Sequence, residues 1–279
     1  MNNKDLYIIE ADKMQGYVVV KDNNFIKRSL YNLGVMEQRV LACAFSMCDS
    51  RMVLGENEVP KCEMSLNAFC ELCNIERRGA VKYLKTVLEK LKKETYWIQK
   101  DDGALRLFSW IHTAEINPET DNIVVWLSLD VKPFLFNLNA DFTEYKLPMI
   151  LRFKNKYSNL VFDLIGVDMG RKSFNYEGKK CYRGGSYQIS VDEMKMRVQV
   201  KRGEGNETVY PNIRFVDLKR KVIEPAVKDI NEFTDIIVDI EYVMKKNKTE
   251  SIIFNYRRKT EEEFKNVPLF RGKPIERMR

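Results

Sequence analysis

Residues 210–234 have the sequence YPNIRFVDLKRKVIEPAVKDINEFT, which predicts one long helix. Pro211 suits the first helical turn, where its missing N–H would have no partner. Its apolar residues form a stripe along one side of the helix, and most of its basic residues lie outside that stripe. Pro225 predicts a kink, because its ring crowds the carbonyl of Lys221. Taken alone, the pattern also fits an ordinary surface helix. The stripe repeats at spacings of three and four, through Phe215, Leu218, Val222, Ala226 and Ile230.

The segments on either side of this helix distinguish a helix within a larger motif from an ordinary surface helix. Alternating apolar residues at 238–242 and 252–256 predict a hairpin, and the turn between them has the basic sequence KKNKTE. Upstream, residues 190–197 predict a short helix, with Ser190 as N-cap and Glu193 at the capping-box position. A short helix, a long basic helix and a hairpin with a cationic tip follow one another in a winged helix. In that fold the long helix enters a major groove and the hairpin, or wing, reaches the phosphate backbone.

Length and charge favour a protein of two domains with a polyanionic partner. The chain has 279 residues and a net charge of +7. Residues 1–140 hold 18 Lys/Arg and 19 Asp/Glu, whereas residues 141–279 hold 29 and 21, so the positive charge lies in the second half. No apolar stretch reaches 18 residues and no signal peptide is evident, so we expect a cytoplasmic protein that does not enter a membrane.

The cysteines admit two interpretations. Cys70 and Cys73 have the spacing of half a zinc site, but the second half is missing because the only histidine is His112 and no other CxxC occurs. Cys70 also falls in a helical pattern, where a free cysteine packs as a small apolar side chain. We expect a reduced chain without a metal or other cofactor.

The first half repeats the plan of the second. A strand at 17–21 precedes an apolar helix with Gly34 as its N-cap and Glu37 reaching back to it. Ser65 is expected to cap a short helix, residues 77–93 form a longer one, and Asp101-Asp102-Gly103 turns a hairpin. Residues 65–75 align with 190–200 without gaps. A Gly-rich insertion at 200–210 predicts a flexible loop. A further helix is expected to open at Leu147-Pro148 and to run through Leu164.

These features resemble the iteron-binding plasmid replication initiators, the initiator replication protein family. The resemblance covers residues 17–258, with two departures from the family pattern, at Gly34 and at Phe162-Asp163. Three stretches carry it in the family's order: Tyr31-Asn32-Leu33 with Glu37-Gln38-Arg39; Lys156-Tyr157-Ser158 with Leu160, Asp163 and Leu164; and 221–226 (KVIEPA) with Asp229-Ile230-Asn231 and Thr234-Asp235.

The resemblance implies an α+β fold of two tandem winged-helix domains related by a pseudo-twofold. We place a flexible N-terminus at 1–16, the domains at 17–140 and 141–258, and a tail at 259–279. Members of the family bind direct repeats at a plasmid origin, help to open an adjacent AT-rich segment and recruit the host helicase, often with the host initiator. Dimers of many members repress their own gene at an inverted repeat, and the family implies a dimer surface mostly on the first domain.

The DNA-binding candidates fall in three groups. Arg214, at the start of the recognition helix, is the expected base reader because arginine grips guanine O6 and N7 with two hydrogen bonds. The remaining basic residues are expected to hold phosphates, although each is also explained as a solvated lysine or arginine. The candidates are Asn212, Arg214, Lys219, Arg220 and Lys221 on the long helix; Lys245, Lys246 and Lys248 on the wing; and Arg77, Arg78, Lys82 and Lys85 in the first domain.

Enzymes and other DNA-binding proteins are the alternative functional classes. A nicking enzyme would need a His-hydrophobe-His metal pair, which one histidine cannot supply, and no phosphate-binding Gly-x4-Gly-Lys-Ser/Thr loop occurs, so we expect no catalysis. A transcriptional repressor with two winged helices, or a phage or chromosomal protein on the same fold, would share the DNA-binding face. In the tail, Leu269 and Phe270 resemble part of a sliding-clamp motif, or they dock on their own domain.

Overall fold

The computed structural model describes residues 16–28, 33–99, 104–171, 173–176, 179–182, 184–198, 201–202, 208–209, 213–265 and 267. The chain forms two compact units. The first holds residues 16–28 and 34–152, and the second holds Leu33 and the described residues from Phe153 to Val267. Residues 141–152, expected in the second domain, group with the first unit because the strand that they contain pairs with its first strand.

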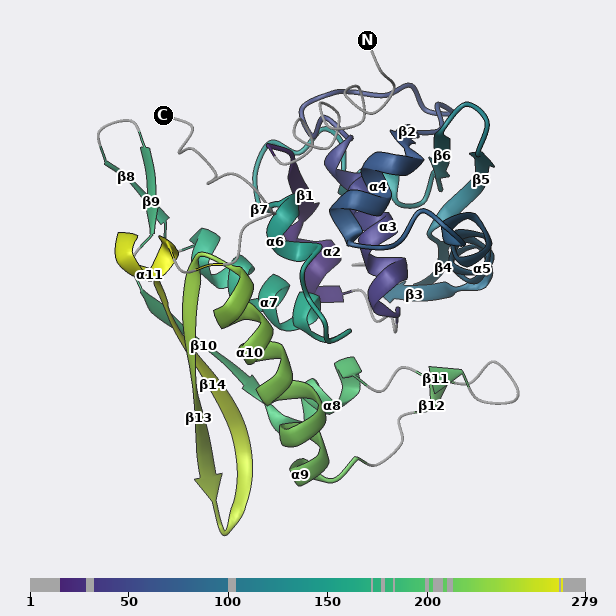
Figure 1. Ribbon diagram of the computed structural model, residues 1–279. Coiled ribbons are helices and arrows are strands. Elements are labelled where there is room, and N and C mark those ends of the chain that lie inside the picture. Colours follow the sequence, from purple (N-terminus) through teal and green to yellow (C-terminus); the bar gives the residue numbers. More distant parts are fainter. Residues whose placement is uncertain are drawn as a thin grey trace. The chain divides into compact units, whose positions relative to one another are not determined.

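The first unit contains two short sheets and one three-stranded sheet (Figure 1). Strand β1 pairs with β7, β3 with β4, and the larger sheet has the order β2-β6-β5. Helices α3 and α5 pack against each other. The elements are β1 (Val18–Asp22), α2 (Asn23–Arg28), α3 (Val35–Ser46), β2 (Lys61–Ser65), α4 (Leu66–Cys73), α5 (Ala80–Lys93), β3 (Thr95–Gln99), β4 (Leu105–Ser109), β5 (Ile111–Asn117), β6 (Asn122–Leu127), η1 (Lys132–Phe134), β7 (Phe142–Lys146) and α6 (Leu147–Ile150).

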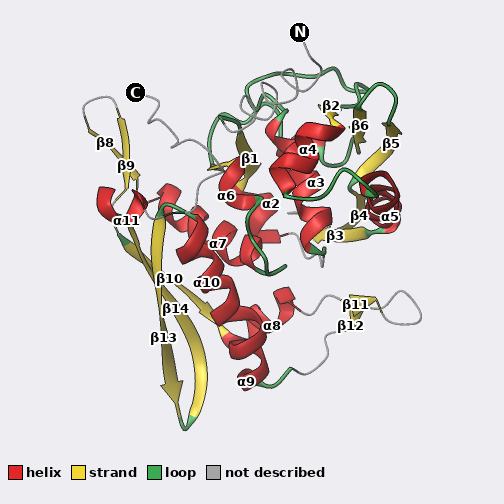
Figure 2. Cartoon of the chain, viewed as in Figure 1, coloured by secondary structure: helices red, strands yellow, loops and turns green. Residues whose placement is uncertain are grey.

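The second unit has one three-stranded sheet of order β10-β14-β13 beside its helices (Figure 2). Helix α10 packs against both α7 and β13. The elements are α7 (Ser158–Arg171), β8 (Ser173–Tyr176), β9 (Lys179–Tyr182), β10 (Gly185–Ser190), α8 (Val191–Val198), β11 (Lys201–Arg202), β12 (Thr208–Val209), α9 (Phe215–Leu218), η2 (Lys219–Ile223), α10 (Glu224–Phe233), β13 (Ile236–Lys245), β14 (Lys248–Arg258) and α11 (Glu261–Lys265).

Both units have the winged-helix order of elements. Each runs from a helix through a strand, two helices and a hairpin, and in each sheet the first strand pairs with the last strand of the hairpin. The aligned serines are equivalent, because each ends the first strand and caps the next helix. The Ser65 hydroxyl accepts the N–H of Ala68 at 3.1 Å, and the Ser190 hydroxyl accepts the N–H of Glu193 at 3.1 Å. The predicted tandem winged-helix fold is therefore confirmed.

The wing of the first unit differs from the expected one. The hairpin predicted around residues 101–103 exists as β3 and β4, but it forms its own two-stranded sheet. The wing is instead the next hairpin, β5–β6, because β6 is the strand that pairs with β2. Its turn runs from Asn117 to Asn122, and it contains Glu119 and Asp121 but no basic residue.

The start of α5 also differs from the prediction. The helix begins at Ala80, because Gly79 adopts φ 85°, a left-handed conformation that glycine accepts readily. Arg77 and Arg78 therefore lie in the turn before the helix rather than on it. At the other side of this turn, Asn74 ends α4 in the left-handed conformation, at φ 52°, which asparagine accepts more readily than most residues.

Gly34 begins α3 as predicted. The carboxylate of Glu37 folds back over it and occupies the space that a Cβ at position 34 would need. Glu37 is almost fully buried and forms an ion pair with Lys90 at 2.6 Å. A side chain at position 34 would therefore displace the Glu37 carboxylate from its present place.

Pro225 produces a change of helix type within a continuous helix. Residues Phe215–Leu218 are α-helical, Lys219–Ile223 form a π-helical turn, and Glu224–Phe233 return to α-helix. Pro225 has no N–H for the carbonyl of Lys221, four residues before it, and its ring crowds that carbonyl. The side-chain amide of Asn155 donates to this carbonyl at 3.4 Å. A π-helical turn therefore lies directly before Pro225, where a kink was predicted.

Two further segments depart from the sequence-based expectations. The helix expected to continue from Leu147 through Leu164 is interrupted, with α6 ending at Ile150 and α7 starting at Ser158. In the insertion at 200–210, Lys201 and Arg202 pair with Val209 and Thr208 in a small antiparallel ladder, where a loop was expected. None of the described helices is long and apolar enough to cross a bilayer.

Candidate nucleic-acid interface

A buried carboxylate fixes the recognition helix (α9, η2 and α10, 215–233) to the second unit. One oxygen of Asp229 accepts the backbone N–H groups of Lys154 and Asn155 at 2.7 and 2.8 Å. The same oxygen accepts the Ser158 hydroxyl at 2.7 Å. Asp229 and Ser158 are both buried. Asp229 thus joins the recognition helix to the turn before α7 and to the first residue of α7. Two of the three stretches that resemble the family meet here.

A second polar contact fixes the wing of the second unit to the same helix. The side-chain amide of Asn231 donates to the carbonyl of Val238 at 2.9 Å and accepts its N–H at 2.7 Å. The ammonium group of Lys259 donates to the carbonyl of Thr234 at 2.8 Å, and burial lowers the pKa of that lysine. Hairpin and helix are therefore held as one rigid surface.

Three cationic side chains at the start of the recognition helix converge on one carboxylate. The oxygens of Asp217 lie 3.0 Å from Arg214, 3.7 Å from Arg220 and 3.2 Å from Lys221. The Asp217 side chain is only 15% exposed, whereas those of Arg214 and Arg220 are 81% and 71% exposed. Hydrogen bonds from Arg214 and Lys221 lower the pKa of Asp217, so the carboxylate stays ionised and keeps the cations on one face.

Lys219 has a different setting from its neighbours. Its ammonium group lies 4.8 Å from the centre of the Tyr242 ring and 3.7 Å from the carboxylate of Glu224. Tyr242 is on the wing hairpin and packs edge-on against Phe215 at 5.4 Å. Burial raises the pKa of Tyr242 to about 12, so its ring stays neutral near pH 7. Lys219 therefore joins the helix to the wing, in addition to carrying charge.

The tip of the second wing is a two-residue turn that presents lysines to solvent. Lys246 and Asn247 have φ values of 46° and 62°, as a type I′ turn requires. Lys245, Lys246 and Lys248 are all exposed, and Lys245 pairs with Glu250 at 2.7 Å. Within the part of the chain that the structure describes, Lys246 and Lys248 form no ion pair. Both are therefore available to an external anion.

Removing the three wing lysines tests their predicted role as phosphate contacts. We expect the triple change Lys245→Ala, Lys246→Ala and Lys248→Ala to weaken binding to every duplex by the same factor. The slope of log K against log salt should fall by about 2–3, since each phosphate contact contributes about 0.9. Titrations of a specific and a random duplex at several salt concentrations measure both quantities. An unchanged slope would show that the wing does not contact phosphates.

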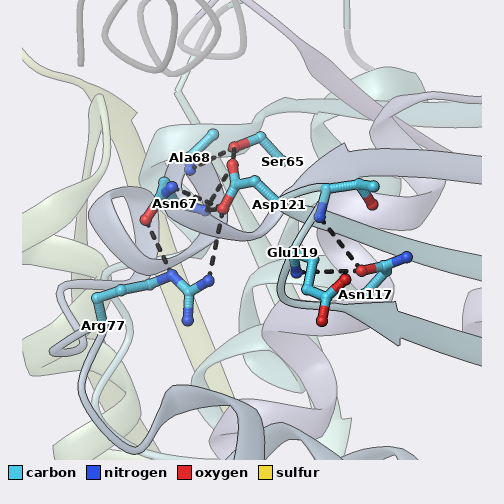
Figure 3. A network of polar contacts seen from close by, with 8 residues as sticks. Ser65, Asn67, Ala68, Arg77, Asn117, Glu119 and Asp121 are labelled. Atoms are coloured by element: carbon cyan, nitrogen blue, oxygen red, sulfur yellow. Dashed lines mark hydrogen bonds and ion pairs between the residues drawn. The ribbon is translucent and has the colours of Figure 1, made fainter. Parts of the chain in front are cut away.

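In the first unit, Arg77 belongs to an internal network (Figure 3). Its Nε donates to the side-chain oxygen of Asn67 at 2.9 Å, and its guanidinium lies 3.7 Å from Asp121 in the wing turn. Asp121 in turn accepts the Ser65 hydroxyl at 2.5 Å and the Asn67 side-chain amide at 2.6 Å. The network ties the wing to the start of α4. Arg77 thus has a structural role besides the DNA contact predicted for it.

The other first-unit candidates remain on the surface. Arg78, Lys82 and Lys85 are exposed, the first in the turn before α5 and the other two on the helix. They lie in a unit whose wing turn carries acidic rather than basic residues. The cationic helix with a cationic wing is therefore found in the second unit.

Removing the side chain of Arg77 should destabilise the first unit more than removing that of Lys82. We expect Arg77→Ala to lower the free energy of unfolding by about 1–2 kcal/mol, because Asn67 and Asp121 lose a partly buried charged partner. Lys82→Ala, on an exposed helix face, should change it by less than about 0.5 kcal/mol. Urea unfolding followed by tryptophan fluorescence measures this, since all three tryptophans, Trp97, Trp110 and Trp126, belong to the first unit. Equal effects of the two substitutions would contradict the network's structural role.

Asn212, Leu269 and Phe270 lie outside the described residues. Cys70 and Cys73 are buried in α4, and the described part of the chain contains no cluster of three or more metal-ligating side chains. Sequence inspection overlooked Asp217 and Tyr242. The first had a usable signal, because cations at spacings of three and four on either side of a carboxylate form helical ion pairs. Tyr242 had none, since its contact depends on how the wing folds back.

Family models match both units. The model described as "Initiator Replication protein, WH1" matches residues 18–166, and the one described as "Initiator Rep protein, WH2" matches residues 190–256. The chain belongs to the initiator replication protein family. This membership agrees with the two winged-helix units and confirms the predicted resemblance.

Two similar proteins support the assignment. A protein named "Replication initiation protein" from Escherichia coli is 23% identical over 242 residues, which cover 86% of this chain and 70% of that protein. The crystal structure of Pi initiator protein in complex with iteron DNA matches with a TM-score of 0.69 and 19% identity. The match covers 88% of this chain and 98% of that one, so the two proteins share their fold along nearly their whole lengths.

Proposed function

We propose that this protein initiates replication of a plasmid by binding direct repeats at the origin through its second unit. The observation that carries the proposal is the cationic cluster of Arg214, Arg220 and Lys221, placed on a helix that is held rigidly to a lysine-tipped wing. A winged helix presents such a helix to the major groove and its wing to the backbone. The solved relative with the same tandem fold is an initiator bound to iteron DNA, which supports direct repeats as the ligand.

Within this proposal the side chains have separate roles. Arg214 reads a base, because it is the most exposed cation at the start of the helix and arginine matches the two acceptors of guanine. Arg220, Lys221 and the wing lysines hold phosphates. Lys219 reaches the backbone from its place over Tyr242. Arg78, Lys82 and Lys85 give the first unit a weaker electrostatic contact, without a basic wing.

Binding of several copies to adjacent repeats opens a neighbouring AT-rich segment and brings in the host initiator and helicase. A dimeric form represses the protein's own gene at an inverted repeat. No catalytic step is assigned to the chain, since the proposal needs only DNA binding and protein contacts. These parts rest on membership of the initiator family.

Permanganate footprinting on a supercoiled plasmid that carries the DNA beside the gene tests initiation. Permanganate oxidises unpaired thymines, so an initiator should produce reactive thymines in an AT-rich segment next to the bound repeats. Host initiator is added in a parallel reaction. A repressor on the same fold would protect its site and leave every thymine paired in both reactions, and that result would contradict the proposal.

A further inference from the structure

One apolar side chain faces solvent within the cationic surface of the second unit. Val216 lies two residues after Arg214 and one before Asp217, and it is 67% exposed. Among the described residues of this unit, no other large apolar side chain is as exposed; Met244 follows at 60% and Met196 at 39%. An exposed valine in this position is surrounded by the groups that would draw DNA phosphates to it.

Neither packing nor helix formation accounts for this valine. Neighbouring residues make the packing contacts instead, because Leu218 is fully buried and Phe215 packs against the ring of Tyr242. A β-branched residue also lowers helix propensity slightly, since its side chain keeps little rotational freedom. Val216 therefore offers two methyl groups to solvent at the end of the helix that enters the groove in a winged helix.

In the major groove, thymine is the only base that carries a methyl group, and small apolar side chains recognise that group by contact. We propose that Val216 is a specificity-determining residue that packs against the C5-methyl of a thymine within the sequence read by the recognition helix. This inference rests on the proposed function and deepens it. It assigns the second unit a thymine contact next to the base read by Arg214.

The test replaces thymine by uracil, which removes only the methyl group. The preferred site is first selected from a random duplex library with the full-length protein, and each thymine of that site is then replaced in turn. The wild-type protein should lose about three- to fivefold in affinity at one thymine, as expected for one buried methyl group. Val216→Ser, which lacks both methyls, should bind the thymine and uracil duplexes equally at that position.

Two further variants show whether the uracil penalty comes from the methyl groups of Val216. Val216→Thr keeps one methyl and should retain part of the uracil penalty. Val53→Ser removes a valine that is 73% exposed in the first unit, and it should retain the full penalty. The inference is overturned if no single thymine gives a penalty that Val216→Ser abolishes, or if that variant weakens all duplexes alike. A selection that yields no common sequence instead contradicts the proposed function itself.

Discussion

Replacing Asp229 with alanine should lower the free energy of unfolding of the second unit by about 2–4 kcal/mol. The substitution leaves two backbone N–H groups and the Ser158 hydroxyl without their shared acceptor, at a place that is buried from water. Urea unfolding followed by far-ultraviolet circular dichroism measures the change. Tryptophan fluorescence, which reports only the first unit, shows whether the two units unfold together.

Asp239→Ala provides the matched control, because Asp239 is an exposed aspartate on β13 of the same unit. Its removal should change stability by less than about 0.5 kcal/mol. Equal effects of the two substitutions would mean that the hydrogen bonds of Asp229 to the turn before α7 do not stabilise the unit. These hydrogen bonds also anchor the helix that carries Arg214 and its neighbours.

Replacing Arg214 with alanine should reduce affinity for the specific site by about 1–3 kcal/mol, or about 5- to 150-fold, and leave random DNA within a few-fold. The loss of sequence preference should be confined to one base pair. At that position the wild-type protein distinguishes between bases and the variant does not. Competition binding with single base-pair replacements across the selected site measures this. The guanidinium also leaves Asp217, whose remaining contacts with Arg220 and Lys221 keep the rest of the cluster in place.

Arg51→Ala is the control for loss of one positive charge, because the Arg51 side chain is 87% exposed in the first unit. It should leave discrimination between base pairs unchanged. If Arg214→Ala weakens specific and random DNA in the same proportion, Arg214 holds a phosphate and does not read a base.

Local sequence signals predicted much of the fold correctly. The sequence predicts Ser65 and Ser190 as helix caps, and each hydroxyl accepts the N–H of the residue three positions later. The long apolar stripe located the recognition helix, and alternation located β13 and β14. These features depend on residues close in sequence, where hydrogen-bond geometry and periodicity leave few alternatives.

Features that depend on distant residues were missed. Strand β7 joins the first unit because it pairs with β1, more than a hundred residues earlier, and β10 pairs with β14 across the helices and strands that lie between them. Arg77 was placed on a helix and assigned only to DNA, since nothing nearby in sequence reveals Asp121 as its partner. The predicted residues Arg214, Arg220 and Lys221 do lie together around Asp217, because charge and helical spacing are local properties. Their contact with DNA stays a prediction.

The most direct test of the central claim is a gel shift of purified protein on a duplex that carries the tandem direct repeats beside the gene, at two salt concentrations. An iteron-binding initiator predicts a ladder of discrete complexes, one for each repeat, that persists at the higher salt while binding to random DNA is lost. A single complex on an inverted repeat, with no ladder on direct repeats, would contradict the claim and identify a repressor.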